Sequence, residues 1–134
     1  MSDFTFLQPK DWAPPQGYAN GIAATGRVVF VAGQIGWNTR AELVSRELTA
    51  QVEQALKNIL AVIAEAGGEA RHITRLTWFV TDKAAYIAQR KEIGGAYRRV
   101  IGKHFPSMTL IVAAGLLEEG ALVEIEATAV VPQG

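Results

Sequence analysis

The 134-residue chain contains no cysteine and only two histidines, and its formal net charge is zero. Without cysteine there is no disulfide framework, no thiolate nucleophile and no cysteine-based zinc or iron–sulfur site. His72 and His104 lie far apart in the sequence and are too few for most histidine-based metal sites, so we expect no metal. The 13 basic and 13 acidic residues cancel, which provides no bulk attraction to nucleic acid or to an acidic membrane.

Signals for export or membrane insertion are also missing. The first residues, MSDFTFLQPK, lack the charged-then-apolar order of a secretion signal. Apolar runs such as Val28 to Ala32 are far shorter than a membrane span. We therefore expect a cytoplasmic protein that does not enter a membrane.

Apolar residues, in contrast, are abundant. The hydrophobic class makes up 49% of the chain, and charged residues make up 19%, against roughly 25% in ordinary soluble domains. A length of 134 residues predicts one domain, residues 1–134, whose interior is limited. Part of the apolar surplus is therefore expected to cover a surface that meets another subunit or a ligand.

The spacing of apolar residues predicts two helices and six strands. One helix begins at Leu48 and ends at Gly67-Gly68, and Asp82 caps a second that ends near Gly102. Gly94-Gly95 within the second helix predicts a kink or close packing. The predicted strands cover residues 4–8, 22–25, 28–34, 75–81, 108–113 and 122–131. Between the first strands, Gly26 and Asn20-Gly21 are competing turn signals.

This order of elements predicts an α/β (α+β) fold. A strand–helix–strand–helix–strand order needs crossover connections, which favour a mixed sheet with both helices packed on one face. The other face is then bare. Two of the strands, Val28 to Ala32 and Leu76 to Val80, are apolar on both sides, so the bare face is the expected subunit contact.

Two carboxylates mark the last strand. Glu124 and Glu126 are two residues apart and share one face, in an otherwise apolar strand. Partial burial of such a pair would raise the pKa of one carboxylate toward a value useful for proton transfer. The alternatives are a solvated edge face or pairing with arginines on a neighbouring strand, and spacing alone does not decide among them.

A basic stretch and one aromatic residue are weaker signals. The second helix ends in a series of basic residues that could contact RNA but that the helix dipole also favours: Arg90, Lys91, Arg98, Arg99, Lys103 and His104. Trp37 follows a glycine-flanked strand end, where it could line a cleft or simply pack.

Several strings, in order and nearly throughout the chain, resemble the Rid/YjgF family of reactive-intermediate imine deaminases, historically named endoribonuclease L-PSP. They are Gly17-Tyr18 through Ala23, VFVAGQIG (29–36), EAGG (65–68), TWFVTD (77–82), HFPSM (104–108) and VEIEATAV (123–130). The resemblance implies a chorismate-mutase-like fold assembled as a homotrimer, with small-molecule clefts between neighbouring subunits. It also places the turn of a hairpin at Gly26. Deaminases of this family hydrolyse enamines and imines to ketones and ammonia without a metal or organic cofactor.

Position by position, the resemblance is incomplete. Tyr18 and Glu124 stand where the family has its cleft tyrosine and its water-associated glutamate. Met108 replaces the arginine that holds the substrate carboxylate, so the chain is a divergent member in which another arginine, such as Arg27 or Arg40, could reach that space. Further replacements are Ala32 for a serine, Leu110 for a cysteine and Gly94 for a helix asparagine. The expected catalytic residue is Glu124, and the expected substrate-binding residues are Tyr18, Ala32, Gly33, Trp37, Met108 and Leu110.

Three functions remain open. The first is hydrolysis of an enamine or imine with a larger, more apolar substrate. The second is a catalytically silent trimer that binds a small metabolite or a protein. The third is RNA binding or cleavage through the basic stretch, which zero net charge makes the weakest.

Overall fold

The structure, a computed structural model, describes residues 4–133. Its elements are β1 (Phe4–Leu7), β2 (Gly21–Ala24), β3 (Arg27–Gln34), α1 (Leu48–Ala64), a short 3-10 helix (Ala70–His72), β4 (Ile73–Val80), α2 (Lys83–Ala88), α3 (Arg90–Val100), β5 (Ser107–Val112) and β6 (Val123–Val131). Within the described residues, no helix is both long and apolar enough to cross a membrane.

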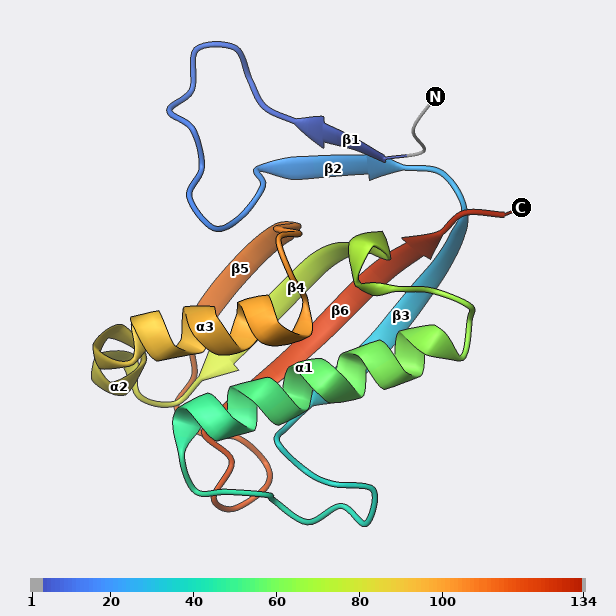
Figure 1. Cartoon of the computed structure of the whole chain (residues 1–134). Helices are drawn as coiled ribbons and strands as arrows, with labels where there is room; N and C mark the ends of the chain where they lie inside the picture. Colours follow the sequence, from blue (N-terminus) through green and yellow to red (C-terminus); the bar gives the residue numbers. More distant parts are fainter. Residues whose placement is uncertain (1–3, 134) are drawn as a thin grey trace.

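A four-stranded mixed sheet forms the centre of the fold. Its strand order is β3-β6-β4-β5, in which β4 and β5 are parallel and the other pairs are antiparallel. All helices lie on one side of this sheet (Figure 1). The predicted mixed sheet with its helices on one face is therefore confirmed.

The hydrophobic core lies between α1, α3 and the sheet. The buried side of α1 repeats at helical spacing through Val52, Leu56, Ile59 and Ile63, all without exposed surface. They pack on the inward residues of β6 and β4. Burial of each such side chain stabilises the fold by about 1.5–3 kcal/mol. The helix ends as predicted, with Gly67 at a φ of 77°.

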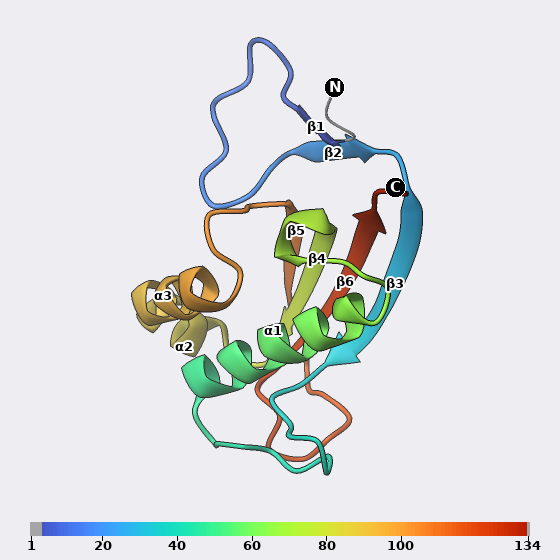
Figure 2. The same ribbon diagram turned by 45° about the vertical axis from the view of Figure 1, so that its right-hand side comes forward.

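The opposite sheet face is open and partly apolar. Val28 and Phe30 of β3 and Ile111 of β5 lie on it, with 52%, 79% and 43% of their surface exposed. Figure 2 shows no element behind the sheet to cover this face. We call it the open face. It is the bare face that the sequence predicts.

The second predicted helix is present but interrupted at Gln89. Gln89 has φ −103° and ψ 14°, so α2 ends there and α3 begins at Arg90. Asp82 caps α2 as predicted, accepting a hydrogen bond from the Ala85 N–H at 3.0 Å. The kink or close packing expected at Gly94-Gly95 is wrong. Both glycines lie within α3, and a Cβ at either would meet only an arginine side chain at ordinary contact distance.

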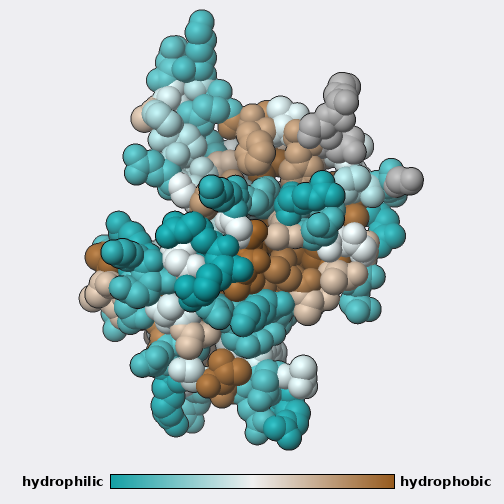
Figure 3. Space-filling view, viewed as in Figure 1, coloured by the Kyte–Doolittle hydropathy of each residue, from teal (hydrophilic) through white to brown (hydrophobic). Residues whose placement is uncertain are grey.

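The first two strands form a separate two-stranded sheet, β1 with β2. Gly26 is the turn, as the resemblance implies, but the expected hairpin is wrong because β2 does not pair with β3. Instead Ala19 bridges to Ser107 at the start of β5, which leads β2 across the end of the sheet (Figure 1). In Figure 3, apolar atoms gather between this β1–β2 pair and the helices.

Candidate functional site

A cavity of about 580 Å³ opens between α3, the first part of β5 and the loop that precedes β2. We call it the aromatic cavity. Three of the predicted site residues, Tyr18, Met108 and Leu110, line it together. Its other lining residues are Gln16, Gly17, Trp78, Tyr86, Arg90, Ile93, Gly94, Tyr97, Arg98 and Phe105.

Stacked aromatic rings form one wall of the aromatic cavity. Tyr97 stacks on Phe105 with 5.6 Å between ring centroids and lies 6.4 Å from Trp78. The Tyr97 hydroxyl donates a 2.6 Å hydrogen bond to the carbonyl of His104, and burial raises the pKa of Tyr97 above its usual value. Tyr97 is thus a fixed neutral wall. Trp78 is 5% exposed, and its Nε1 has no hydrogen-bond partner among residues 4–133.

Two arginines complete this cavity from α3. Arg90, Gly94 and Arg98 are spaced four residues apart, which places them on one side of the helix. Neither arginine forms an ion pair within the described part of the chain. Arg27 and Arg40, the candidates considered from sequence, do not line the cavity, and Arg40 pairs with Glu42 at 3.4 Å.

Glu124 lies elsewhere, on the open face. It is half-buried on β6 opposite Phe79, whereas Glu126 is exposed opposite Thr77. Pairing with cross-strand arginines is therefore wrong, and neither glutamate forms an ion pair among residues 4–133. A Cβ at Gly33 would overlap the Glu124 carboxylate, so the side chain rests directly on the glycine backbone.

Ala32 and Gly33 form an irregular segment of β3 beside Glu124. The pairing with β6 shifts register between Val31 and Gln34, a bulge of the kind found near functional sites. The Gln34 side-chain amide donates to the Ala32 carbonyl at 3.1 Å, and the Trp37 indole donates to Gln34 at 3.4 Å. Trp37 thus reaches this segment through Gln34 and does not line the aromatic cavity.

The seven predicted site residues therefore fall into two groups. Trp78 and Leu110 are register partners facing the helices, whereas Phe79 and Glu124 are partners on the open face. In one copy of the chain, Glu124 and the aromatic cavity are on opposite sides of the sheet. Glu124 cannot meet Met108 or Leu110 unless a second copy supplies it.

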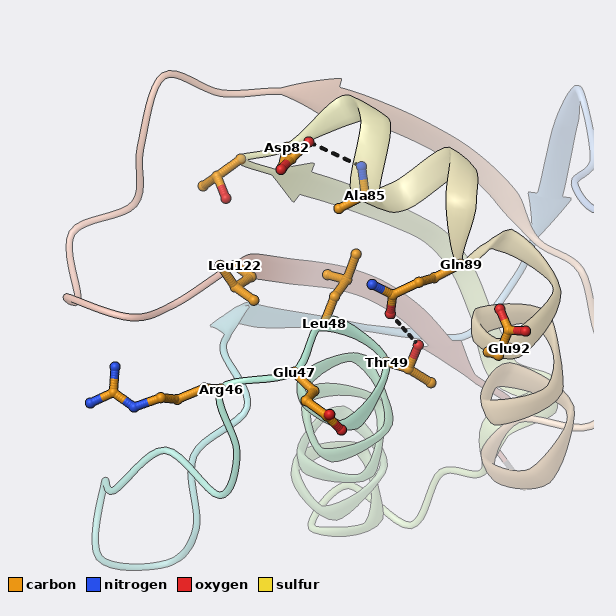
Figure 4. Close-up of a pocket in the computed structure, with 10 residues that line it drawn as sticks. Arg46, Glu47, Leu48, Thr49, Asp82, Ala85, Gln89, Glu92 and Leu122 are labelled. Atoms are coloured by element: carbon orange, nitrogen blue, oxygen red, sulfur yellow. Dashed lines mark hydrogen bonds between the residues drawn. The ribbon is translucent and has the colours of Figure 1, made fainter.

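A second cavity, of about 540 Å³, lies where α1 and α2 begin (Figure 4). Three of its polar side chains have structural partners: Asp82 caps α2, and the Thr49 hydroxyl donates to the Gln89 side chain at 2.9 Å. No predicted site residue lines this cavity. Across residues 4–133, no cluster of three or more histidine or acidic side chains could hold a metal ion.

Sequence reasoning missed Arg90, Arg98 and the aromatic wall as site residues. The basic stretch does not form one cationic face, because Arg90 and Arg98 line the cavity whereas Arg99 pairs with Glu53 at 2.7 Å. An RNA-binding surface through this stretch is therefore less favoured, because its basic residues do not lie on one face. The four-residue spacing of Tyr86, Arg90, Gly94 and Arg98 is the sequence signal that could have revealed the cavity side of α3.

Comparison with known proteins gives consistent matches over most of the chain. The family model described as Endoribonuclease L-PSP matches residues 9–131. Protein DfrA of Myxococcus xanthus is 34% identical over 106 residues, covering 78% of this chain and 77% of its own. The human 2-iminobutanoate/2-iminopropanoate deaminase is 28% identical over 105 residues, covering 78% and 73%. The crystal structure of YyfB from Yersinia pestis, a protein of unknown function of the Rid family, has a TM-score of 0.85 at 28% identity and covers 96% and 99%.

Proposed function

The chain belongs to the Endoribonuclease L-PSP family, also called Rid or YjgF, and from this premise we propose that it hydrolyses an enamine or imine to a carbonyl compound and ammonia. The relative from Homo sapiens that is named as an imine deaminase supports this chemistry. The observation that carries the proposal is the Glu124 carboxylate, which lies on the Gly33 backbone without an ion-pair partner among residues 4–133.

Glu124 activates water in this proposal. An iminium carbon is already electrophilic, so the site needs to position water and move protons. The water oxygen bonds to that carbon as the C=N π pair moves to nitrogen, and Glu124 takes a proton from the water. Glu124 then returns the proton to the nitrogen. As the C–N bond breaks and ammonia leaves, Glu124 takes the hydroxyl proton so that the neutral carbonyl forms, and this proton then passes to the released ammonia or to solvent. An enamine enters the same route after protonation at carbon.

The active unit is a homo-oligomer, a homotrimer by family resemblance. Within one chain Glu124 and the aromatic cavity lie on opposite sides of the sheet. A site that contains both forms when the open face of one copy meets the β5 edge of another, which also buries Phe30 and Ile111. The ligand then lies between subunits. A cytoplasmic location remains a prediction.

The substrate is larger and more apolar than a short 2-imino acid. Met108 cannot form the bidentate ion pair that an arginine would form with a carboxylate. The wall around Met108 consists mostly of aromatic and aliphatic side chains, including Tyr18, Trp78 and Leu110. Ala32 and Gly33 contact the substrate from the side of the neighbouring copy, and Trp37 acts by holding Gln34.

The test is ammonia release from enamines and imines generated in situ, with and without a carboxylate and with small or aromatic side chains. We expect the wild type to act best on an aromatic member. Glu124→Gln should lower kcat by roughly 10²–10⁴-fold, the usual contribution of a general base. Glu126→Gln, on the same strand face but exposed, is the matched control and should retain activity. Equal turnover by Glu124→Gln would reject the role of Glu124 in the mechanism. No turnover by the wild type would reject hydrolysis and leave a binding module.

A further inference from the structure

We propose that Arg90 and Arg98 of α3 bind the anionic group of the ligand, a carboxylate, in place of the missing arginine at position 108. The inference rests on the proposed function for its chemistry, and it names the substrate class: an imine or enamine acid with an aromatic or large apolar body. The anion site itself can be tested by binding alone.

The helix places both guanidinium groups at the cavity. Arg90 and Arg98 are separated by two helical turns, with Gly94 between them, and all three line the same cavity. The Arg98 side chain folds back along the helix, because its Nη1 lies 3.9 Å from the position of a Cβ at Gly94. The Arg98 guanidinium therefore lies beside the bare backbone of Gly94, in a cavity that Arg90 also lines.

The charges at this cavity are not used within the described chain. Neither Arg90 nor Arg98 forms an ion pair among residues 4–133, and the residues that line the cavity include no aspartate or glutamate. The adjacent Arg99 differs, since Glu53 holds it on the side facing α1. Two unpaired cations over a cavity without acidic groups attract an anion, and a guanidinium recognises a carboxylate with two parallel hydrogen bonds.

The rest of the cavity defines the apolar part of the ligand. Trp78, Phe105, Met108 and Leu110 lie on the other side, from β4, β5 and the segment before β5. An aromatic body suits this wall, because aromatic rings stack in offset or edge-to-face geometry. A ligand with its carboxylate at α3 and its ring against Trp78 and Met108 satisfies both sides of the cavity.

Gly94 provides a second, independent argument for the same anion site. Glycine is unfavourable inside a helix relative to alanine, yet Gly94 lies in the middle of α3. A Cβ there would contact only the end of the Arg98 side chain, whose Nη1 lies 3.9 Å away. We infer that the missing side chain leaves room for the carboxylate.

The probes are phenylacetate and its neutral isostere phenylacetamide, titrated calorimetrically against the whole protein at low and high salt. We expect the wild type to bind phenylacetate about tenfold more tightly than phenylacetamide, as one charge-assisted pair provides. Arg98→Gln and the double variant Arg90→Gln/Arg98→Gln should lose that preference, because the carboxylate then lacks its cationic partners. Both side chains are exposed, so their replacement spares the fold. Arg99→Gln is the matched control and should keep it.

The glycine pair provides the second comparison. Gly94→Ala and Gly95→Ala both raise helix propensity and should raise the unfolding temperature slightly. Gly95 does not line the cavity, so Gly94→Ala alone should weaken phenylacetate binding. A loss of binding in a stabilised variant cannot come from misfolding.

Binding without preference for the carboxylate, or a preference that survives in the double arginine variant, overturns the anion site while hydrolysis can still stand. Arginine-dependent binding of phenylacetate without turnover of any imine supports the anion site and rejects the proposed function instead.

Discussion

Phe30 is the sharpest test of assembly through the open face. Its surface is 79% exposed in one chain, although an aromatic side chain buries roughly 150–250 Å² in a core or interface. Covering that exposed part, roughly 120–200 Å², at about 25 cal/mol per Å² stabilises an oligomer by about 3–5 kcal/mol per copy as an upper bound. Phe30→Lys removes this contribution and also places a charge where the neighbouring sheet should pack.

A loss of 3 kcal/mol corresponds to more than a hundredfold weaker association, because each 1.4 kcal/mol is about tenfold. Sedimentation velocity over a range of concentrations should show an oligomer for the wild type and a monomer for Phe30→Lys. Circular dichroism should be unchanged, since Phe30 makes little contact within its own chain. Enzyme activity should vanish with the oligomer, because the proposed site takes its cavity and its Glu124 from different copies.

Val62→Lys is the matched control. Val62 is also an exposed aliphatic residue, 40% exposed, but it lies on α1 in the helix layer. Its replacement should leave the oligomer and the activity intact. The reasoning fails if Phe30→Lys sediments like the wild type, or if the wild type is a monomer that hydrolyses imines.

Two further predictions concern the shared site and acid stability. The first uses hetero-oligomers made by refolding equal amounts of Glu124→Gln and a cavity-filling variant, Leu110→Trp. They should recover roughly a quarter of wild-type activity, since one site in four then combines an intact cavity with an intact Glu124. No recovery would place the whole site in one chain. Burial, helped by the nearby Arg71, lowers the pKa of His72 below the ordinary histidine value of about 6.5, so the unfolded chain binds the proton more readily. The free energy of unfolding in urea should therefore be intact above pH 6.5 and fall as the pH drops below it, with a shallower decline in His72→Gln.

Local sequence patterns predicted the elements better than their partners. The helical spacing of α1 and the alternation of β4 and β6 predicted the core, because those side chains are buried where the periodicity places them. The pairing of β2 was not predictable, since a four-residue strand carries little information about register or partner. The interruption at Gln89 also had no signal, because glutamine is an ordinary helix residue.

For the candidate site, too, the sequence predicted local features better than which residues the fold brings together. Strand alternation placed Glu124 and Glu126 on one face of β6, but the sequence could not show that Met108 and Leu110 face the opposite side of the sheet, because that depends on the register between β4 and β5. Arg98 was missed since cations near a helix C-terminus have a sufficient explanation in the helix dipole. Arg90 was missed because it begins α3 only through the interruption at Gln89, which the sequence does not signal. Their significance comes from what the fold places opposite them.

Moving the anion-binding charge from β5 to α3 changes how a substrate lies in the cavity. With arginine at position 108 a carboxylate would bind on the strand, whereas here the strand offers Met108 and Leu110 to the apolar body. A ligand held by Arg90 and Arg98 then extends from α3 toward the β5 edge, the edge at which a neighbouring copy would bring Glu124. The proposals thus give the apolar surplus of the sequence two uses, since one part would form the subunit contact on the open face and another would select the substrate. In the proposed assembly these uses are coupled, because the subunit contact that would bury Phe30 is also the contact that would bring Glu124 to the cavity.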